Sequence, residues 1–238
     1  METSPKVIVV TPTYNERGNL TELVEQIFAL KIANLSLVVV DDNSPDGTGD
    51  LAEELTKRFP IQVIHRASKE GLGRAYVYAF KEILLQKPDF IIQLDADLSH
   101  DPRDIPRMLE AIENYDLVLG SRYTKGGGVR NWNFFRRLIS RFGNIYASVM
   151  LWIPYRDLTG GFRCFRREVL EKINPDTLSS VGYNFQIELT YRTHKKGFRI
   201  REVPIIFTER KSGVSKFNWG IFWESFVKVF WLGFGEKK

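Results

Sequence analysis

Short apolar runs alternate with amphipathic stretches through the first part of the chain. The apolar runs are rich in valine and isoleucine and pass into polar loops, as buried strands of a parallel sheet do, and they lie at residues 6–14, 35–40, 61–65 and 90–94. After the first run, apolar positions recur at helical spacing, at Leu20, Leu23, Val24, Ile27 and Leu30. Alternating strands and helices predict an α/β fold, with a mostly parallel central sheet and helices on both faces.

The second half of the chain predicts a more varied set of elements. In order, we expect a strand at 116–123, a glycine-rich basic loop at 124–132, a helix at 134–155, a turn at 157–165, a helix at 183–197 and a strand at 198–210. The loop has glycines at 126–128 and is interpreted either as a lid over a substrate or as a connector. The helix begins with arginines and continues apolar, which suits either a membrane surface or a core position.

The last residues form an aromatic, amphipathic pattern. A helix there would place six aromatic side chains on one side, namely Trp219, Phe222, Trp223, Phe226, Phe230 and Trp231. Such aromatic density is typical of a segment at a bilayer surface, although packing against the domain explains it equally well. We therefore predict one domain over 1–216 and a C-terminal amphipathic helix over 217–238.

Two aspartates follow the strand at 90–94 and offer the clearest chemistry. In an extended segment, side chains two positions apart point the same way, so Asp95 and Asp97 could converge on one cation. Mg²⁺ or Mn²⁺ takes few protein carboxylates and fills its other positions with water and phosphate oxygens. The pair therefore predicts a metal site for a nucleotide diphosphate, with helix capping as the ordinary alternative. Tyr14 and Asp42 follow neighbouring strands and should lie at the same edge of the sheet.

Composition narrows the class of protein. The 238 residues are 43% hydrophobic, enough for the core of one large domain. The single cysteine, Cys164, allows no internal disulfide and is expected to be a buried hydrophobe. No signal peptide and no long uninterrupted apolar run are visible, so an intracellular protein is expected. A net charge of +5 suits anionic partners.

Five motifs in this order resemble a known family. They are PTYNE at 12–16, VVVDDNSPDGT at 38–48, DADLSH at 95–100, GSRY at 120–123 and RKSGVSK at 210–216. Together they resemble family-2 glycosyltransferases of GT-A (Rossmann-like) fold, and within them the polyprenol (dolichol) phosphate mannosyl synthases. The resemblance implies an inverting, Mg²⁺- or Mn²⁺-dependent enzyme. It would move mannose from GDP-mannose to a dolichyl or undecaprenyl phosphate.

The resemblance also assigns roles to single residues. The guanosine would be held by Pro12, Tyr14, Glu16, Val40 and Asp42, and the ribose, diphosphate and metal by Asp95, Ala96 and Asp97. The donor diphosphate would be neutralised by Arg210 and Lys216, and the acceptor phosphate by Arg122 and Arg136. Asp97, Arg122 and Arg136 would then be the catalytic residues. Ser99 stands where some relatives use a glutamine on the metal, so a water could replace that third ligand.

The chemistry of the acceptor separates several possible reactions. A phosphate monoester is mostly a dianion at neutral pH, so it needs alignment and cations rather than a general base. A hydroxyl acceptor would need a base, for which Asp157 is the candidate. Transfer of glucose from UDP-glucose also stays open, as does a non-catalytic, membrane-docked nucleotide-binding subunit. A nicotinamide dehydrogenase is disfavoured because no G-x-G-x-x-G follows the first strand.

An isoprenoid acceptor implies contact with a membrane. We expect a peripheral protein at the cytoplasmic face, reaching the membrane through the helix at 134–155, through the aromatic tail or through a membrane-protein partner. A nucleic-acid partner is not expected.

Overall fold

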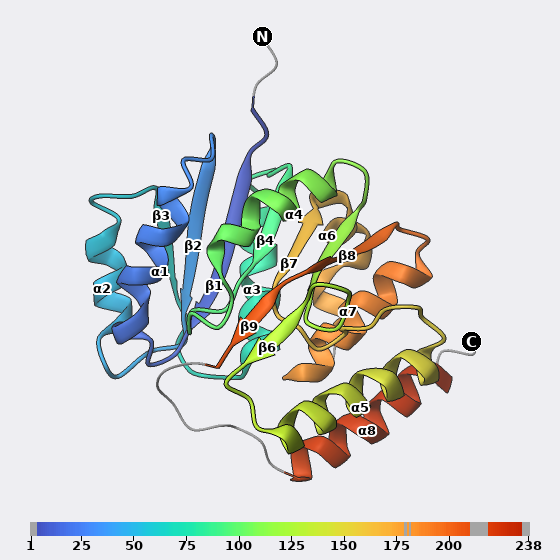
Figure 1. The fold of residues 1–238 in the computed structure, drawn as a ribbon. Coiled ribbons are helices and arrows are strands. Elements are labelled where there is room, and N and C mark those ends of the chain that lie inside the picture. Colours follow the sequence, from blue (N-terminus) through green and yellow to red (C-terminus); the bar gives the residue numbers. More distant parts are fainter. Residues whose placement is uncertain (1–3, 179, 181, 210–218, 235–238) are drawn as a thin grey trace.

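A seven-stranded sheet forms the centre of the computed structural model, which describes residues 4–178, 180, 182–209 and 219–234 (Figure 1). Its strand order is β3-β2-β1-β4-β7-β5-β8. All neighbours run parallel except β7, which is antiparallel to both β4 and β5. This confirms the predicted mostly parallel sheet, built from β1 (Val7–Thr13), β2 (Leu35–Asp41), β3 (Ile61–His65), β4 (Phe90–Gln93), β5 (Leu117–Ser121), β7 (Arg163–Arg166) and β8 (Ile200–Pro204).

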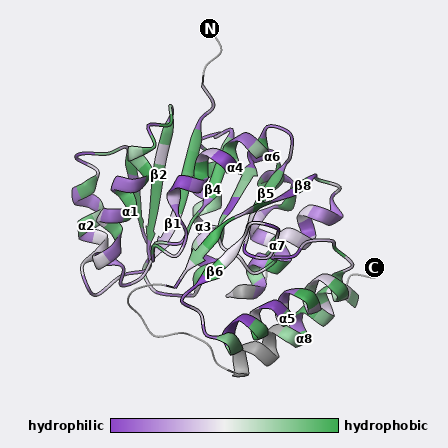
Figure 2. Cartoon of the chain, in the orientation of Figure 1, coloured by the Kyte–Doolittle hydropathy of each residue, from purple (hydrophilic) through white to green (hydrophobic). Residues whose placement is uncertain are grey.

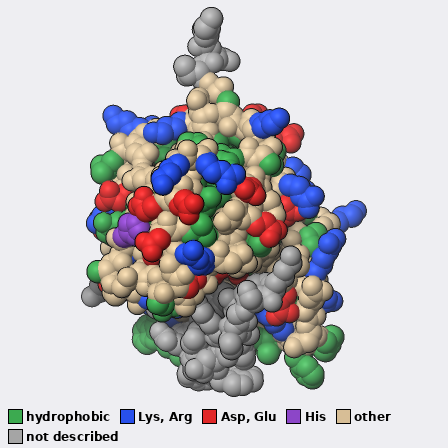
Figure 3. Space-filling view, turned by 90° about the vertical axis from the view of Figure 1, so that its left-hand side faces the viewer, with side chains coloured by type: hydrophobic (Ala, Val, Ile, Leu, Met, Phe, Trp, Pro, Cys, Tyr) green, Lys and Arg blue, Asp and Glu red, His purple; other side chains and the backbone are tan. Residues whose placement is uncertain are grey.

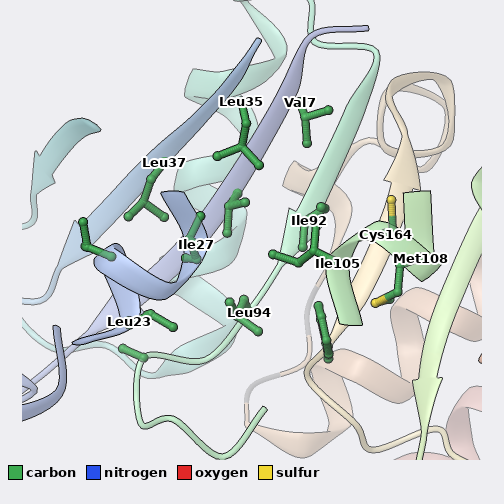
Figure 4. Packing of buried hydrophobic residues seen from close by; sticks show 14 of the residues in the cluster. Val7, Leu23, Ile27, Leu35, Leu37, Ile92, Leu94, Ile105, Met108 and Cys164 are labelled. Carbon is green, nitrogen blue, oxygen red and sulfur yellow. The ribbon is translucent and has the colours of Figure 1, made fainter. Parts of the chain in front are cut away.

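Helices cover both faces of this sheet. One face carries α1 (Arg17–Ala29), α2 (Thr48–Leu55) and α4 (Ile105–Ile112), and the other carries α3 (Leu72–Leu84), α6 (Arg167–Ile173) and α7 (Tyr183–Lys195). The strands are apolar along most of their length while the helices alternate, as Figure 2 shows. Figure 4 shows the first core, where Ile27 of α1 and Met108 of α4 pack onto β1, β2 and β4. Cys164 lies in this core and is fully buried, as predicted.

Two further helices lie side by side at one end of the molecule (Figure 1). They are α5 (Phe134–Leu151) and α8 (Trp219–Phe234), and they pack on α7 through a third apolar cluster that includes Ala147, Ile187 and Val229. Within the described residues, no helix combines the length and apolar character needed to cross a membrane. The predicted C-terminal helix is therefore present, while the domain division at residue 216 stays a prediction.

The strand predicted over 198–210 is wrong as a single element. It breaks after β8, and β9 (Ile206–Thr208) leaves the central sheet to pair in parallel with β6 (Gly128–Arg130), part of the predicted glycine-rich loop. Ile205 bridges the two sheets, because its amide donates to the Ser121 carbonyl at 3.0 Å and its own carbonyl accepts from the Gly128 amide at 3.0 Å. This junction carries β6 and β9 from the sheet toward α5.

The turn predicted over 157–165 is wrong in its last part, because β7 begins at Arg163 and lies in the middle of the sheet. The sequence does not reveal this strand because it begins with a charged residue, Arg163, whose side chain is nevertheless fully buried. It donates to the backbone carbonyls of Leu158, Gly160 and Gln186 at 2.8–3.0 Å. Burial lowers the pKa of Arg163 to about 9, which still leaves it charged at neutral pH.

Candidate active site

The loops that follow β1, β2 and β4 meet at the carboxyl edge of the sheet, as predicted. Pro12 and Val40 are direct neighbours in the β1–β2 register. The amide of Asp42 donates to the Thr13 carbonyl at 3.0 Å, and that of Leu94 to the Val10 carbonyl at 3.1 Å. Parallel pairing therefore brings the ends of three distant segments to one place.

Asp95 and Asp97 lie close enough to influence each other, although not by the geometry predicted for them. β4 ends at Gln93, so both aspartates lie beyond the strand, and Asp97 lies in a turn that includes Leu98 with φ of 59°. Burial and the charge of Asp97 raise the pKa of Asp95 to about 7. Two carboxylates under this mutual repulsion favour a cation between them.

The donor atoms at this turn fit a hard divalent ion. Carboxylate oxygens come from Asp95 and Asp97, and the hydroxyl of Ser99 is buried without a hydrogen-bond partner among the described residues. Those residues contain no group of three or more His, Cys, Asp or Glu placed to hold a metal. Mg²⁺ and Mn²⁺ need few protein ligands when a diphosphate supplies the rest, so the set fits that chemistry.

A fully buried histidine lies beneath the aspartates and was missed by sequence reasoning. His100 Nδ1 lies 3.8 Å from Asp95 Oδ2, and the ring packs between Phe162 and Phe207 with centroid distances of 5.5 and 5.1 Å. Burial lowers the pKa of His100 to about 4, so its ring is neutral at pH 7. His100 is therefore a buried, uncharged neighbour of the acidic pair.

Two cations lie at the predicted nucleoside end of the edge. Arg66 forms a nearly buried ion pair with Asp42, and burial raises the pKa of Asp42 despite that partner. Lys69 Nζ lies 3.6 Å from the ring centroid of Tyr14. Both cations come from the loop after β3, in which the sequence had drawn attention only to glycines. Their position after a strand end was the available signal.

Arg122, which directly follows β5, is held by Asp157. Its Nε and Nη2 each donate to a carboxylate oxygen of Asp157 at 2.7 Å, and Nη2 also donates to Thr159 Oγ1 at 2.7 Å. Burial would raise the pKa of Asp157, but the charge and hydrogen bonds of Arg122 outweigh it and lower that pKa. A carboxylate so engaged is a weak general base, so the geometry favours a role for Asp157 in positioning Arg122, and the hydroxyl-acceptor alternative stays a prediction to be tested.

The loop that carries Asp157 also packs against Asp95. A Cβ on Gly161 would lie 2.7 Å from Asp95 Oδ2, so a larger residue here would displace the Asp95 carboxylate. Arg163 holds the same loop by two of its carbonyls. The geometry of Asp95 and of Arg122 is thus set by one short segment.

Arg136 lies at the start of α5, where the side chain of Asn133 caps the helix by accepting from the Arg136 amide at 2.8 Å. Its guanidinium forms an ion pair with Glu209 at the end of β9 and lies over the ring of Trp132. Arg122 contacts the same ring. The structure therefore brings together the two arginines that the sequence assigned to the acceptor.

A cavity of about 780 Å³ opens beside the acidic turn, between α1 and β9. Its lining includes Asn19, Asp97, Ser99, His100 and Glu209, but not Pro12, Tyr14, Val40 or Asp42. It therefore extends the site on the Asp97 side only. The predicted diphosphate-binding residues Arg210 and Lys216 lie outside the described residues, directly after Glu209 in the chain.

Comparison with known proteins places this site in context. The model of the family described as glycosyl transferase family 2 matches residues 8–174. A polyprenol monophosphomannose synthase of Mycolicibacterium smegmatis is 44% identical over 227 residues, covering 94% of this chain and 85% of that protein. An undecaprenyl-phosphate mannosyltransferase of Micrococcus luteus is 42% identical over 225 residues, covering 94% and 92%.

Solved structures agree on the fold. A mannosyltransferase of Pyrobaculum calidifontis in complex with GDP-Man and Mn²⁺ has a TM-score of 0.65 and 18% identity, covering 99% of this chain and 64% of that one. Glucosyl-3-phosphoglycerate synthase of Mycobacterium tuberculosis in complex with UDP has a TM-score of 0.70 and 18% identity, covering 98% and 82%. At such identity the likeness concerns architecture alone.

Proposed function

We propose a reaction for this chain from the premise that it belongs to glycosyl transferase family 2, whose model covers most of its length. The chain is a glycosyltransferase. The reaction is inverting transfer of mannose from GDP-mannose to a polyprenyl phosphate, which gives polyprenyl phosphate mannose and GDP. The relatives from M. smegmatis and M. luteus, whose names specify polyprenyl acceptors and mannose, support this choice.

One observation carries the proposal: Asp95 of the acidic pair and Arg122 of the arginine pair contact a common loop. Asp95 packs against Gly161, and Arg122 is bound by Asp157 and Thr159 of the same 157–161 segment. A reaction between two anionic substrates needs a cation-binding group on the donor side and fixed cations on the acceptor side. This arrangement provides both.

On the donor side, the assigned residues bind and orient GDP-mannose. Pro12, Tyr14, Glu16, Val40 and Asp42 would hold the guanosine, with Lys69 and Arg66 beside them. Asp95, Ala96 and Asp97 would hold the ribose, the diphosphate and a Mg²⁺ or Mn²⁺ ion. When bound, such an ion supplies Lewis-acid stabilisation of the departing diphosphate. Arg210 and Lys216 would add positive charge to that group.

On the acceptor side, Arg122 and Arg136 would align the phosphate for attack. Most of this phosphate is a dianion at neutral pH, because its second pKa is near 6, so it attacks without a base. Asp157 keeps Arg122 in place. The pair between Arg136 and Glu209 is about one-third exposed on both sides, so an incoming phosphate can replace the carboxylate.

The α5 helix also presents an apolar surface, which we assign to the membrane. Seven of its residues or flanking residues recur at helical spacing, each more than half exposed, and form the α5 stripe of Phe134, Phe135, Leu138, Phe142, Ile145, Val149 and Trp152. On α8, Phe230, Trp231 and Phe234 are also exposed. Green side chains project at this end of the molecule in Figure 3.

Charge and position favour a lipid surface for the α5 stripe. Arg137 and Arg141 are exposed on the same helix and would face anionic headgroups at the cytoplasmic side. Arg136 lies in the first turn of this helix, so an acceptor phosphate held there would leave its isoprenoid tail near the bilayer. No spanning helix or membrane-protein partner is then needed for access.

Transfer of labelled sugar tests the donor assignment. Purified chain would be given polyprenyl phosphate, Mn²⁺ and either GDP-mannose or UDP-glucose, and organic-extractable product would be counted. Label from GDP-mannose alone supports the proposal. Label from UDP-glucose alone would replace the donor and keep the mechanism. Metal-dependent GDP binding without any turnover would favour a nucleotide-binding subunit.

Flotation with lipid vesicles tests the membrane assignment. Leu138→Ser with Phe142→Ser and Ile145→Ser should lower the fraction that floats with phosphatidylglycerol-containing vesicles, because these changes remove apolar surface from the α5 stripe. Leu85→Ser is the control, since Leu85 is 78% exposed at the C-cap of α3, outside the α5 stripe. If the triple variant floats with the vesicles as well as Leu85→Ser does, the α5 stripe does not bind the membrane.

A further inference from the structure

Trp132 occupies a position that neither the motifs nor the assigned chemistry explains. It lies between β6 and α5, and only 8% of its surface is exposed. The guanidinium carbon of Arg136 lies 4.3 Å from its ring centroid, and that of Arg122 lies 5.5 Å from it. Phe207 packs edge-on against the indole at a centroid distance of 5.4 Å. One aromatic ring thus contacts both arginines.

We propose that Trp132 is a positioning residue for the acceptor phosphate, and that its ring holds Arg122 and Arg136 together as one phosphate-binding pair. The inference rests on the proposed function, which assigns these arginines to the acceptor. It adds a residue that touches neither the donor nor the reacting atoms. Its effect should therefore be confined to acceptor binding.

Electrostatics explains why such a ring is needed. Two guanidinium groups repel each other, and each is held separately by its own carboxylate, Arg122 by Asp157 and Arg136 by Glu209. The face of an aromatic ring attracts a cation without carrying a charge that would repel phosphate. When a phosphate replaces Glu209, the contact between Arg136 and Trp132 remains. The ring can therefore keep Arg136 beside Arg122 through the exchange of partners.

The choice of tryptophan over a simpler aromatic residue supports a role in cation binding. Trp132 Nε1 is buried and has no hydrogen-bond partner within the described part of the chain. A buried N–H without a partner lowers stability, and phenylalanine would avoid that penalty in the same place. Indole is the aromatic group that binds cations most strongly. The unpaired N–H is thus consistent with a residue kept for its ring face rather than for packing.

Binding of a short, water-soluble isoprenyl monophosphate, followed by calorimetry, measures the arginine pair directly. We expect Trp132→Leu to weaken binding about tenfold and Trp132→Phe about threefold, since the first removes the ring and the second keeps a weaker one. Binding of GDP with Mn²⁺ should be unchanged in both variants. In transfer assays, KM for the acceptor should rise while kcat at saturating acceptor stays near wild type.

Tyr155→Leu is the matched control. It removes a partly buried aromatic ring that packs on His194, away from the arginines, and should leave monophosphate binding unchanged. Thermal unfolding of each variant shows whether it is folded. If Trp132→Leu does not fold, the affinity of Trp132→Phe for the monophosphate, compared with that of the wild type, tests the inference.

Several results would overturn the inference. Wild-type affinity in Trp132→Leu, or in Trp132→Phe where that variant decides, would show that the ring does not organise the pair. Parallel loss of GDP and monophosphate binding would make Trp132 a general packing residue. A wild-type chain that does not bind the monophosphate would remove the acceptor site and this inference with it. If the wild type binds the monophosphate but transfers no mannose, the donor assignment fails and the role of Trp132 is still decided by binding.

Discussion

At the scale of single residues, Asp97 changes the protonation of its neighbour. Burial and the charge of Asp97 together raise the pKa of Asp95 to about 7. Asp97→Asn removes that repulsion together with one of the two carboxylates proposed to bind the metal. We expect the variant to stay folded by circular dichroism, with a midpoint of thermal unfolding without metal at least as high as that of wild type. Turnover should collapse, and stabilisation by Mn²⁺ should be lost.

The control for Asp97→Asn is Glu110→Gln, which neutralises an exposed carboxylate on α4. It should keep wild-type turnover and wild-type stabilisation by Mn²⁺. Chelation of metal from the wild type should abolish transfer without unfolding the protein. Substantial turnover by Asp97→Asn would disprove its role.

Asp157 separates the two classes of acceptor. The Asp157 carboxylate positions Arg122. Asp157→Asn should therefore raise KM for the acceptor phosphate several-fold and leave the pH at half-maximal rate unchanged. A general base would behave differently, because its loss typically costs about 10²–10⁴ in rate. A loss of that size together with a shifted pH profile would restore the hydroxyl-acceptor mechanism.

Residues inside motifs could be predicted from the sequence, whereas their partners could not. Asp95, Asp97 and Arg122 were singled out by motif and by position after a strand. Trp132 and Glu209 gave no signal, because their roles depend on β6 and β9 pairing across a long stretch of chain. Such contacts follow from topology, which a local pattern does not encode.

At the scale of elements, a buried side chain of α5, Asn144, joins this helix to the loop around Arg122. Asn144 accepts from the amides of Leu158 and Thr159 at 2.7 and 3.2 Å and donates to Thr159 Oγ1 at 3.1 Å. Thr159 in turn accepts from Arg122. The helix that carries the α5 stripe therefore also supports the loop around the acceptor arginine.

Asn144→Ala should lower the free energy of unfolding by about 1–3 kcal/mol, because it leaves buried amides without a partner. Urea unfolding measures this change. Asn114→Ala is the control, since Asn114 is exposed at the end of α4 and should change stability little. If Asn144→Ala and Asn114→Ala lower the free energy of unfolding by the same small amount, the contact between α5 and the loop makes no measurable contribution to stability.

The elements themselves were predicted unevenly, for physical reasons. Apolar runs identified β1, β2 and β4, which are buried on both faces of the sheet. β7 is as long as β4 and similarly buried, but two of its four residues are arginines, so it lacks the apolar run that marks a central strand. In the small sheet, β6 lies in a glycine-rich segment and β9 follows β8 after a single residue. The sequence therefore showed neither the start of β6 nor the break between β8 and β9.

At the scale of the whole molecule, the carboxyl edge of the sheet gathers the residues assigned to the donor together with Arg122, which directly follows β5. Arg136 and the surface assigned to the membrane lie on α5, which packs with α8 at one end of the molecule (Figure 1). The common loop at 157–161, which contacts Asp95 and Arg122, became visible only in the folded chain.

The central claim is that the acceptor phosphate is itself the nucleophile, held by arginines and needing no base. The most direct measurement compares transfer of labelled mannose from GDP-mannose to a polyprenyl phosphate and to the free polyprenol of the same length. We expect labelled lipid only with the phosphate, and little of it with Arg136→Ala. Comparable labelling of the free alcohol would contradict the claim.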